Sequence, residues 1–501
     1  MRKLTYLLLL TSFGSFAQQA EMPLTHFFMY ENAPKLADSS QKTTFTVKPL
    51  VTNIFTNQPK FKWDLFAALF ERMPIRVQKA DFNLAIYPLF NIQANKNFTE
   101  TKQLHYNTRG IKLEGSIGKQ VWYATEFYEN QAFLEPTEIA FTERFLVIPG
   151  QGAGKIFKTT GYDFSSAAGT VHYVPNKMLS FSMGHGKHLV GNGYRSLFLS
   201  DNAFNYPFFR TNATVGNWHY TAIFTQFREF KYKYYAYHVK KHASFGIITW
   251  KPNKIFDVSF LAASVWQTSG IDYVNKFRPE FFLPPIISPL FEYKNDKKTS
   301  KFGINASVVL LNNFGFYTQM LMHNVKPDFP VEYAIQAGAK CYDLFFGLLK
   351  KSHLYLQVEY NKIAENFDAG ENKYMGFSHY NQPLGHSAGN NLDEFLAISE
   401  LKFGRLSLNY KFNRILGYKA EKSALSGTSY SNIDFDYPIE KLANKTTVYH
   451  QLDAAVTINP AYRLQLAAGV FNVTRSAANA FSGTTIYVVL RTNLRNLYFD
   501  Y

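Results

Sequence analysis

Apolar and polar residues alternate along most of the chain after residue 80. In 405–412, for example, apolar Leu406, Leu408, Tyr410 and Phe412 are separated by single polar residues. Because successive side chains of a β-strand point to opposite faces, a two-residue period predicts strands with one apolar and one polar face. Runs of the same kind lie at 82–92, 111–117, 120–128, 218–228, 255–266, 303–311, 314–322, 331–339, 353–361, 395–403, 448–458, 462–471 and 484–491.

Alternation by itself also fits a soluble β-sandwich, in which one face of each sheet meets water. The number of runs and their separation by tight polar turns and longer loops favour a different architecture. We therefore predict an all-β fold, a transmembrane antiparallel β-barrel with an apolar outside and a polar lumen.

The N-terminus carries the features of an export signal. Residues 1–17 contain Arg2 and Lys3, an apolar run through Leu10, and small residues up to Ala17, which predicts a cleaved signal peptide. Past this segment, the chain has no stretch of about 18 uninterrupted apolar residues that would span a membrane as a helix. A closed barrel is the other way to satisfy every backbone group in lipid, so the expected location is the outer membrane.

Residues 18–76 differ from the rest, because 59–72 has apolar residues at helical spacing. We expect one amphipathic helix there, in a periplasmic segment that closes the lower end of the barrel, and the barrel itself over 77–501. The end of the chain, 486–501, is expected to be a final strand that finishes on an aromatic residue, Tyr501.

Composition adds three points. Aromatic residues reach 17%, with 48 Phe and 33 Tyr against 5 Trp, as the aromatic girdles of a barrel require. The single cysteine, Cys341, excludes an internal disulfide and a cysteine-rich zinc site. The net charge of +16 becomes +14 without Arg2 and Lys3, which favours acidic polysaccharide or lipid head groups as partners over nucleic acid, although dispersed loop lysines explain it equally well.

The stretch 181–210 has the densest set of glycines, histidines and charged residues. Its Gly191-Asn192-Gly193 sequence is a strong turn signal, because Asn-Gly tolerates the positive φ angles of a tight hairpin. We predict two short strands, 181–190 and 194–200, that pair with each other across this turn.

Several side chains in this stretch invite a chemical interpretation. His185 and His188 would point to opposite faces of a strand, so no metal and no cofactor is predicted. Ser196, Ser200, Asp201 and His188 contain the ingredients of a hydrolytic triad but lack a G-x-S-x-G elbow, so we do not predict an enzyme, and a lipid-modifying activity is the third alternative. Gly184 and Gly186 share one strand face and predict the close approach of a neighbouring helix or strand, in preference to a ligand.

Polar residues here and in the irregular segment 364–394 have the chemistry to hold sugars. Charged groups and amides bind hydroxyls and acidic groups, and aromatic rings stack on sugar faces. For 181–210, a structural network inside the barrel is the favoured alternative, since buried polar groups must be partnered. The candidate ligand-binding residues are Lys187, Asn192, Tyr194, Arg195, Asp201, Asn202, Tyr374, His379, Tyr380, Asn381, Gln382 and His386.

The sequence GHGKHLVGNGYRSLFLSDNA at 184–203 resembles the signature of Wzi-like outer-membrane proteins of capsule assembly, and most closely their RemB-type gliding-motility relatives. Three other blocks look like family blocks: Asn107–Gly110 with the strand 111–117, Gly161–Phe164, and His379–Leu384. The resemblance implies a barrel of about 18 strands, with helices closing the periplasmic side.

The resemblance also implies a non-enzymatic role in binding or anchoring capsular or exopolysaccharide, and the likeness to the RemB-type relatives adds support of gliding as an expected role. The expected partners are cell-surface polysaccharide and outer-membrane lipid, with the barrel a monomer. The alternative class is a transport or assembly barrel that docks a gliding or secretion partner. Many weak sugar contacts on many barrels would retain a long polymer.

Overall fold

We analysed a computed structural model of the chain. The structure describes residues 20–22, 24–37, 46–52, 69–100, 104–230, 238–267, 284–287, 298–323, 331–349, 352–368, 370, 375–418, 445–476, 480–492, 494 and 496–500. The predicted signal peptide, 1–17, lies outside these residues, as does most of the predicted helix 59–72. Of that helix only its end is described, where residues 69 and 70 are helical.

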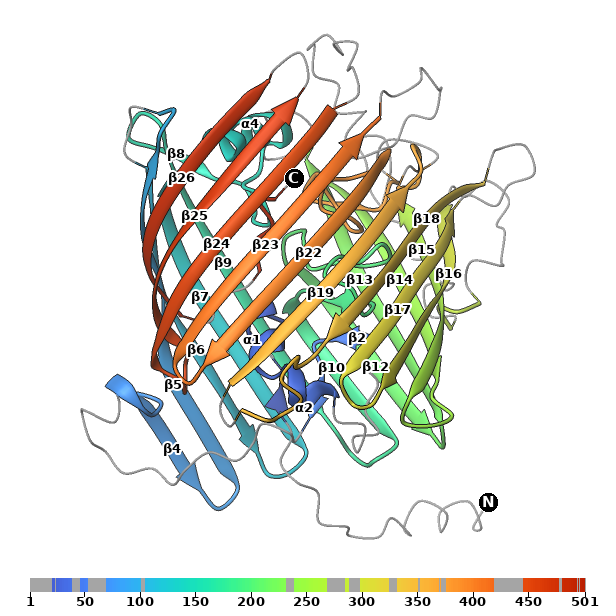
Figure 1. Ribbon diagram of the computed structural model, residues 1–501. Coiled ribbons are helices and arrows are strands. Elements are labelled where there is room, and N and C mark those ends of the chain that lie inside the picture. Colours follow the sequence, from blue (N-terminus) through green and yellow to red (C-terminus); the bar gives the residue numbers. More distant parts are fainter. Residues whose placement is uncertain are drawn as a thin grey trace, which may run out of the picture.

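The described strands form a closed barrel, which confirms the predicted fold class (Figure 1). Eighteen strands of the described chain make the ring, each antiparallel to its neighbours, and β26 pairs with β5 to close it. The ring strands are β5 (Phe82–Asn97), β6 (Leu104–Ile117), β7 (Val121–Phe133), β9 (Gly161–Tyr173), β10 (Leu179–Gly186), β12 (Tyr206–Val215), β13 (Trp218–Phe230), β14 (His238–Trp250), β15 (Phe256–Gln267), β16 (Lys298–Leu310), β17 (Phe314–His323), β18 (Glu332–Cys341), β19 (Ser352–Ile363), β22 (Leu392–Phe403), β23 (Leu406–Gly417), β24 (Lys445–Asn459), β25 (Leu464–Ser476) and β26 (Phe481–Arg491).

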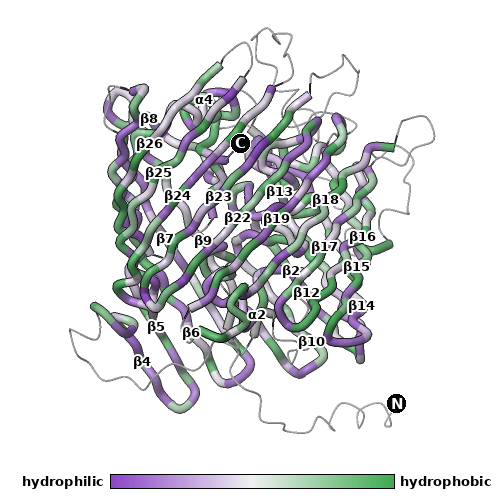
Figure 2. The backbone as a smooth tube through the Cα atoms, viewed as in Figure 1, coloured by the Kyte–Doolittle hydropathy of each residue, from purple (hydrophilic) through white to green (hydrophobic). Residues whose placement is uncertain are grey.

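The two faces of the wall differ as the alternation predicts. On β19, Val358 and Tyr360 are 45% and 42% exposed on the outside, whereas Gln357, Glu359 and Asn361 are buried in the lumen. The same alternation of hydrophobic and hydrophilic positions runs along the strands in Figure 2. The outside of the barrel is therefore an apolar belt, and the interior is lined with polar groups.

Connections at the two ends of the barrel differ in length. At one end the turns are short, such as the two residues between β12 and β13 or between β22 and β23. At the other end the connections are long, and one of them carries helix α4 (Pro136–Phe145) and strand β8 (Lys155–Phe157), which pairs with the start of β9. Strand β4 (Ile75–Lys79) pairs with the first residues of β5, 82–86, at the short-turn end (Figure 1). Among the described residues no helix is long and apolar enough to cross a membrane.

The N-terminal segment lies inside the barrel, near the short-turn end (Figure 1). It contains β1 (Ala20–Glu21), α1 (His26–Glu31), α2 (Ala33–Ala37), β2 (Val47–Lys48) and β3 (Val51–Thr52). The described helices of this segment are thus α1 and α2, which the sequence analysis did not predict. They are anchored to the wall by Glu31, which forms ion pairs with Lys402 and with Arg463, the latter at 3.0 Å.

The predicted hairpin in 181–210 is wrong. β10 is a wall strand, and from residue 187 the chain leaves the wall and turns into the lumen until β12 begins at Tyr206. Within this inserted loop, residues 187–205, the short strand β11 (Leu189–Val190) pairs with β2 of the N-terminal segment. A partner from elsewhere in the chain therefore takes most of the predicted local pairing, of which one antiparallel bridge remains between Val190 and Leu199.

The predicted final strand over 486–501 is also wrong in part. β26 ends at Arg491, and the described residues that follow, 492, 494 and 496–500, turn into the lumen; we call them the C-terminal tail. Tyr498 and Asp500 are 3% and 0% exposed there. Polar partners inside the barrel hold them, as described below, so the last aromatic residues that the structure describes do not extend the wall.

Candidate functional site

The inserted loop is the centre of the lumenal structure. Its side chains are almost all buried, and it contacts the N-terminal segment, the C-terminal tail and the wall. The turn that carries it needs glycine at position 191, where φ is +129° and a Cβ would lie 2.9 Å from the amide nitrogen of Gln319. The Gly-Asn-Gly signal thus marks a real turn, but one that points inward.

Arg195 joins the loop to the wall and to the C-terminal tail. One of its terminal nitrogens lies 2.8 Å from Oε1 of Glu394 on β22 and 3.1 Å from Oδ1 of Asp500. Lys411 on β23 lies 3.1 Å from the other Asp500 oxygen, and Nε2 of His386 is 2.6 Å from Glu394. Arg195, Glu394, Asp500 and His386 are buried and Lys411 is half-buried, so each charge depends on its partners to offset the cost of desolvation.

The charges of this network set the protonation of its members in the loop and tail. Burial by itself would raise the pKa of Asp500, but Arg195 and Lys411 hold that pKa below its ordinary value. Burial would likewise lower the pKa of Arg195, yet the two carboxylates, Asp500 first, raise it well above its usual value. The guanidinium and the tail carboxylate are therefore a fixed ion pair.

Asp201 connects the loop to both ends of the chain. Its carboxylate accepts hydrogen bonds from the Tyr498 hydroxyl at 2.6 Å and from the Asn496 amide at 2.8 Å. Asn496 in turn accepts a bond from the backbone N–H of His26 at 2.9 Å. The His26 ring stacks on Tyr194 with centroids 4.3 Å apart. Loop, tail and N-terminal segment therefore form one hydrogen-bonded unit.

Wall side chains also satisfy the backbone of the loop. Glu359 accepts the N–H groups of Tyr194 at 2.7 Å and Arg195 at 3.1 Å. Gln319 accepts the N–H of Leu197 at 2.9 Å, and Gln336 donates to the carbonyl of Arg195 at 3.1 Å. These partners come from β17, β18 and β19, whose polar faces the alternation predicted to point into the lumen.

The opposite side of the loop is apolar. Phe198 is fully buried and meets Phe245 of β14 edge to face, with ring centroids 5.6 Å apart. Around it lies a core of buried apolar residues from the loop, from the segment after β19, and from strands β12 to β15, β17 to β19, β22 and β23. The largest of these side chains are Tyr206, Phe227, Phe367 and Phe377. The lumen thus contains a hydrophobic core of its own.

The segment between β19 and β22 also folds inward, where β20 (Ser378–His379) and β21 (Gln382–Pro383) pair. His379 accepts the N–H of Arg228 at Nδ1 over 3.0 Å, and its Nε2 lies 3.0 Å from the carbonyl oxygen of Asn205. Burial lowers the pKa of His379 to about 3, so the ring is neutral at neutral pH. Gln382 accepts the N–H of Gly150 at 2.6 Å.

The structure places the candidate ligand-binding residues mainly inside the barrel. It brings Tyr194, Arg195, Asp201 and His386 into the network around Arg195, and it groups His379, Asn381 and Gln382 in the second inward segment. Asn192 and Tyr380 are half-buried, and Tyr374 lies outside the described residues. The buried members are Lys187, Tyr194, Arg195, Asp201, Asn202, His379, Asn381, Gln382 and His386. Their role as sugar contacts stays a prediction.

The structure does not bring the triad ingredients together. Ser196 is buried and donates to the carbonyl of Val190 at 2.5 Å, and its oxygen accepts the N–H of Leu199 at 3.1 Å. The His188 ring packs instead on Tyr206 and Phe208. His185 is on the outer side of the wall, against the carbonyl of Ala167. Ser196 is therefore engaged in holding the loop turn.

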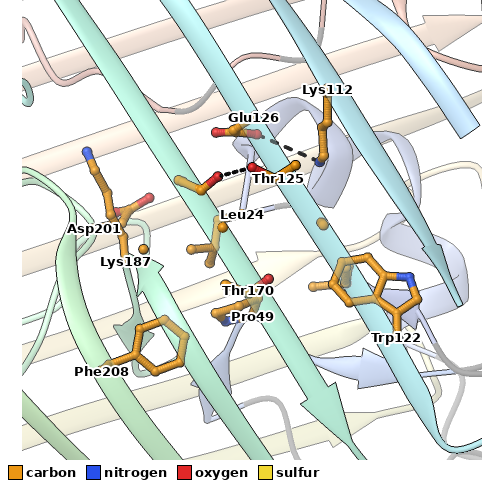
Figure 3. Close-up of a pocket in the computed structure, with 15 residues that line it drawn as sticks. Leu24, Pro49, Lys112, Trp122, Thr125, Glu126, Thr170, Lys187, Asp201 and Phe208 are labelled. Carbon is orange, nitrogen blue, oxygen red and sulfur yellow. Dashed lines mark hydrogen bonds and ion pairs between the residues drawn. The ribbon is translucent and has the colours of Figure 1, made fainter. Parts of the chain in front are cut away.

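A cavity of about 100 Å³ separates the inserted loop and N-terminal segment from the wall (Figure 3). Lys112 and Glu126, 3.9 Å apart, lie at one side of it, and Lys187 and Asp201 lie at another. The Trp122 and Phe208 rings close its lower part in the same view. A second cavity of about 40 Å³ lies near His26, Lys48 and Tyr194.

Helix α4 at the long-loop end was not predicted from the sequence. It begins with proline after Glu135, and a capping box links Glu135 and Glu138. This pattern is a readable start signal. Glu135 also accepts hydrogen bonds from Asn95 at 2.9 Å and Asn97 at 3.0 Å, which fixes the helix over β5.

Three cations lie together at this end: Arg144 on α4, Lys445 at the start of β24 and Arg475 near the end of β25. Arg144 and Arg475 are both close enough to act electrostatically on Lys445. Arg144 and Lys445 are exposed, and Arg475 is half-buried. We call these three residues the basic rim; like charges held together favour an anionic partner.

Comparisons with known proteins bear on the fold. No family model matches the sequence, and no curated protein sequence matches it. Among solved structures, OprD from Pseudomonas aeruginosa is 11% identical, with 81% of this chain and 92% of that chain covered and a TM-score of 0.44. OccAB2 of Acinetobacter baumannii is 8% identical, with coverages of 81% and 97% and a TM-score of 0.44.

A stronger structural likeness is to Wzi, an outer-membrane protein involved in group 1 capsule assembly in Escherichia coli and described as a carbohydrate-binding β-barrel. It is 14% identical, the match covers 95% of this chain and 100% of that chain, and the TM-score is 0.56. At this identity the likeness concerns the fold. The chain has the fold of an outer-membrane β-barrel similar to that of Wzi.

Proposed function

We propose that this protein resides in the outer membrane and binds or anchors cell-surface polysaccharide at its long-loop end. In this proposal residues 1–17 are a cleaved signal peptide, 18–76 close the periplasmic end, and 77–501 form the barrel. The long-loop end is the extracellular one, because outer-membrane barrels have short periplasmic turns and long outer loops.

The observation that carries the proposal is the filled lumen. Arg195, Asp201 and Phe198 connect the inserted loop to both chain ends and to the wall, through ion pairs, hydrogen bonds and a buried core. A barrel filled in this way is better suited to holding a ligand at its outer surface than to passing a solute. The likeness to a carbohydrate-binding barrel supports the same choice.

The basic rim supports an acidic polysaccharide as the ligand. Arg144, Lys445 and Arg475 present positive charge where a polymer outside the cell would first meet the barrel. Single contacts of this kind are weak and screened by salt. Many barrels on one long polymer would nevertheless retain it, because each additional contact is an intramolecular event.

Retention of the host's own acidic polysaccharide by purified protein on an affinity matrix tests the proposal. We expect the wild type to retain the polymer and the triple variant R144A/K445A/R475A to lose most of that retention, with retention falling as salt rises. The matched control removes three exposed lysines at the short-turn end, in the variant K79A/K119A/K254A, and should retain the polymer. No retention by the wild type would overturn the proposal, and equal loss in both variants would overturn the role of the basic rim.

A role in gliding or secretion would require a partner protein in addition to polysaccharide. Deletion of the gene separates these roles: loss of retained surface polysaccharide with normal movement favours anchoring alone, whereas loss of movement with normal polysaccharide favours a gliding partner. Steady, large conductance of the purified protein in a planar bilayer would favour a transport barrel instead.

A further inference from the structure

The wall of the barrel contains a break between β9 and its neighbour β10. The paired residues of these strands run from Phe181 with Tyr173 to His185 with Gly169. Strand β8 covers only positions 161–163 of β9, further up. Within the described chain, residues 164–168 of β9 therefore have no strand partner on this side, although β7 pairs with them on the other side. We call this stretch the seam.

Side chains replace the missing strand at the seam. The amide of Asn205, the last residue of the inserted loop, donates to the Ala167 carbonyl at 2.9 Å and to the Ser166 hydroxyl at 3.2 Å. The His185 ring lies 3.2 Å from the same Ala167 carbonyl. Backbone groups at membrane depth must be satisfied, and side-chain bonds do this with less constraint than a ladder of strand pairs. The seam consequently has fewer strand-to-strand bonds to break than the paired stretches of β9 beside it.

The seam adjoins the apolar belt on its outer side. Immediately below it, Val171 and Met183 are 45% and 61% exposed. At the seam itself the outward residues are small: Ser165 and Ala167 are exposed, and Gly169 is half-buried. On the neighbouring β7, exposed Phe127 pairs with Ala167 and exposed Glu129 pairs with Ser165, so the lower part of the seam adjoins the upper edge of the apolar belt.

The larger cavity meets the seam at Ala168 and continues behind the paired residues below it. Its lining includes Ala168, Gly169 and Thr170 of β9 together with Gly186, the last residue of β10. Gly169 and Gly186 place no side chain between the cavity and the end of the β9–β10 ladder. A Cβ on Gly186 would meet only Phe208 at 3.4 Å and Thr170 at 3.7 Å, so the space beside it belongs to the cavity.

The lining of the cavity is amphipathic. Met22, Leu24, Trp122 and Phe208 form its apolar side, and the Lys112–Glu126 pair forms its polar side (Figure 3). Two lysines and two acids among the lining residues balance in charge. Such a lining accommodates part of an alkyl chain near a polar group, and it does not select a strongly charged ligand.

We propose that the seam is a lateral entrance through which the alkyl chain of a membrane-borne amphiphile reaches the cavity behind β9 and β10. The proposal requires the barrel to lie in a membrane but is independent of polysaccharide binding. The occupant is a membrane molecule because the break adjoins the apolar belt, whereas a sugar polymer would arrive from the long-loop end.

Photo-crosslinking of wild-type protein tests this proposal. The protein is reconstituted in vesicles of phosphatidylcholine that contain a phospholipid with a diazirine at the end of one acyl chain, irradiated, and mapped by mass spectrometry. We expect adducts on the lumenal residues Met22, Leu24 or Trp122 as well as on belt residues such as Met183 and Phe209. Adducts confined to the belt would overturn the proposal. Lumenal adducts formed only with a water-soluble diazirine sugar would also overturn it, in favour of a sugar site.

A pair of variants distinguishes entry through the seam from general permeability. Ala168→Leu fills the cavity and should abolish the lumenal adducts while the belt adducts remain. Ala455→Leu makes the same change at a buried alanine of β24, away from the cavity, and should leave the lumenal adducts unchanged. Asn205→Ala removes the side-chain hydrogen bonds that replace the missing strand at the seam, and it should increase the number of lumenal adducts. Equal lumenal labelling in all three variants would contradict entry at the seam.

Discussion

The two sides of the inserted loop are held by different forces. On one side, the Arg195 guanidinium is paired with Glu394 and Asp500, and Glu359 accepts the backbone N–H of Arg195. On the other side, Phe198 packs in the buried apolar core, edge to face with Phe245 of β14. The loop is therefore held by charge on one side and by hydrophobic packing on the other, within the same lumen.

This difference teaches how a barrel with a polar interior acquires a fixed plug. Hydrophobic packing is tolerant of geometry, whereas a buried ion pair is costly unless its geometry is satisfied. The apolar side supplies affinity between loop and wall. The ionic side allows only one position of the loop, and it includes the C-terminal tail in that position. The two sides should therefore respond differently to substitution, salt and pH.

The largest effect is expected from Arg195→Ala. Removing the guanidinium leaves Glu394 and Asp500 buried without their main partner, which costs about 3–5 kcal/mol. We expect local opening of the loop to become easier by that amount, measured from hydrogen exchange at the Val190 amide, which donates to Leu199. The variant R195M/E394Q/D500N, which removes Arg195 together with both of its carboxylate partners, should recover most of the loss. A triple variant as unstable as Arg195→Ala would show that volume, not charge, holds this side.

Phe198→Ala should cost nearly as much on the apolar side, about 3–4 kcal/mol, because it removes a fully buried ring and leaves a cavity. The same exchange measurement at Val190 applies. Unlike the loss in Arg195→Ala, this loss should be independent of salt, and Phe198→Leu should cost about 1 kcal/mol. A strong salt dependence in Phe198→Ala would contradict the division of the loop into two sides.

Acidification by one pH unit below pH 6.5 should loosen the second inward segment by a smaller amount than either substitution. The pKa of His379 is about 3 in the folded protein, against an ordinary value of about 6.5. Below pH 6.5 the His379 ring takes up a proton when the segment is open but stays neutral when the segment is closed. The closed state is therefore fully stable above pH 6.5, and its free energy relative to the open state weakens by about 1.4 kcal/mol per pH unit as pH falls toward 3. Exchange at the Leu384 amide, which bonds to Phe377, measures it. His379→Gln should remove the dependence at this amide; an unchanged slope would assign it to another group.

The smallest effect is expected from Lys402→Ala, which removes one partner of Glu31 at the short-turn end. Both side chains are partly exposed, and Arg463 remains at 3.0 Å, so the cost should be below about 1 kcal/mol. Proteolysis of the N-terminal segment from the short-turn side measures it. Rapid cleavage in this variant would show that the pair, and not the interior contacts, holds α1 in place.

Sequence periodicity predicted the wall well, because each strand reports its own two faces. Residues 353–361 are an example: the apolar positions are exposed in the belt and the polar ones are buried in the lumen, as expected. Gly184 was likewise predicted to mark a close strand contact, and a Cβ there would lie 2.1 Å from the carbonyl oxygen of Gly169.

The lumenal site was much less predictable, because its partners are distant in sequence. Nothing local to Val190 indicates pairing with Val47, and nothing near Arg195 indicates Asp500. The turn at Gly191 therefore suggested a local hairpin, although the chain instead enters the barrel. Only the density of polar groups in 181–210 indicated a buried network. Tyr498 and Asp500 gave no such signal, because they lie in a run that was expected to be a strand.

The contact between the two chain ends has a consequence for biogenesis. Asn496 bonds to Leu24 and His26, and Tyr498 bonds to Asp201, so the earliest and latest parts of the described chain meet on a segment from its middle. Those bonds require the last strand to be in place. During insertion these interior contacts therefore form only after β26 has paired with β5 and closed the barrel. The time at which the inner segments become protected from protease would measure this last step.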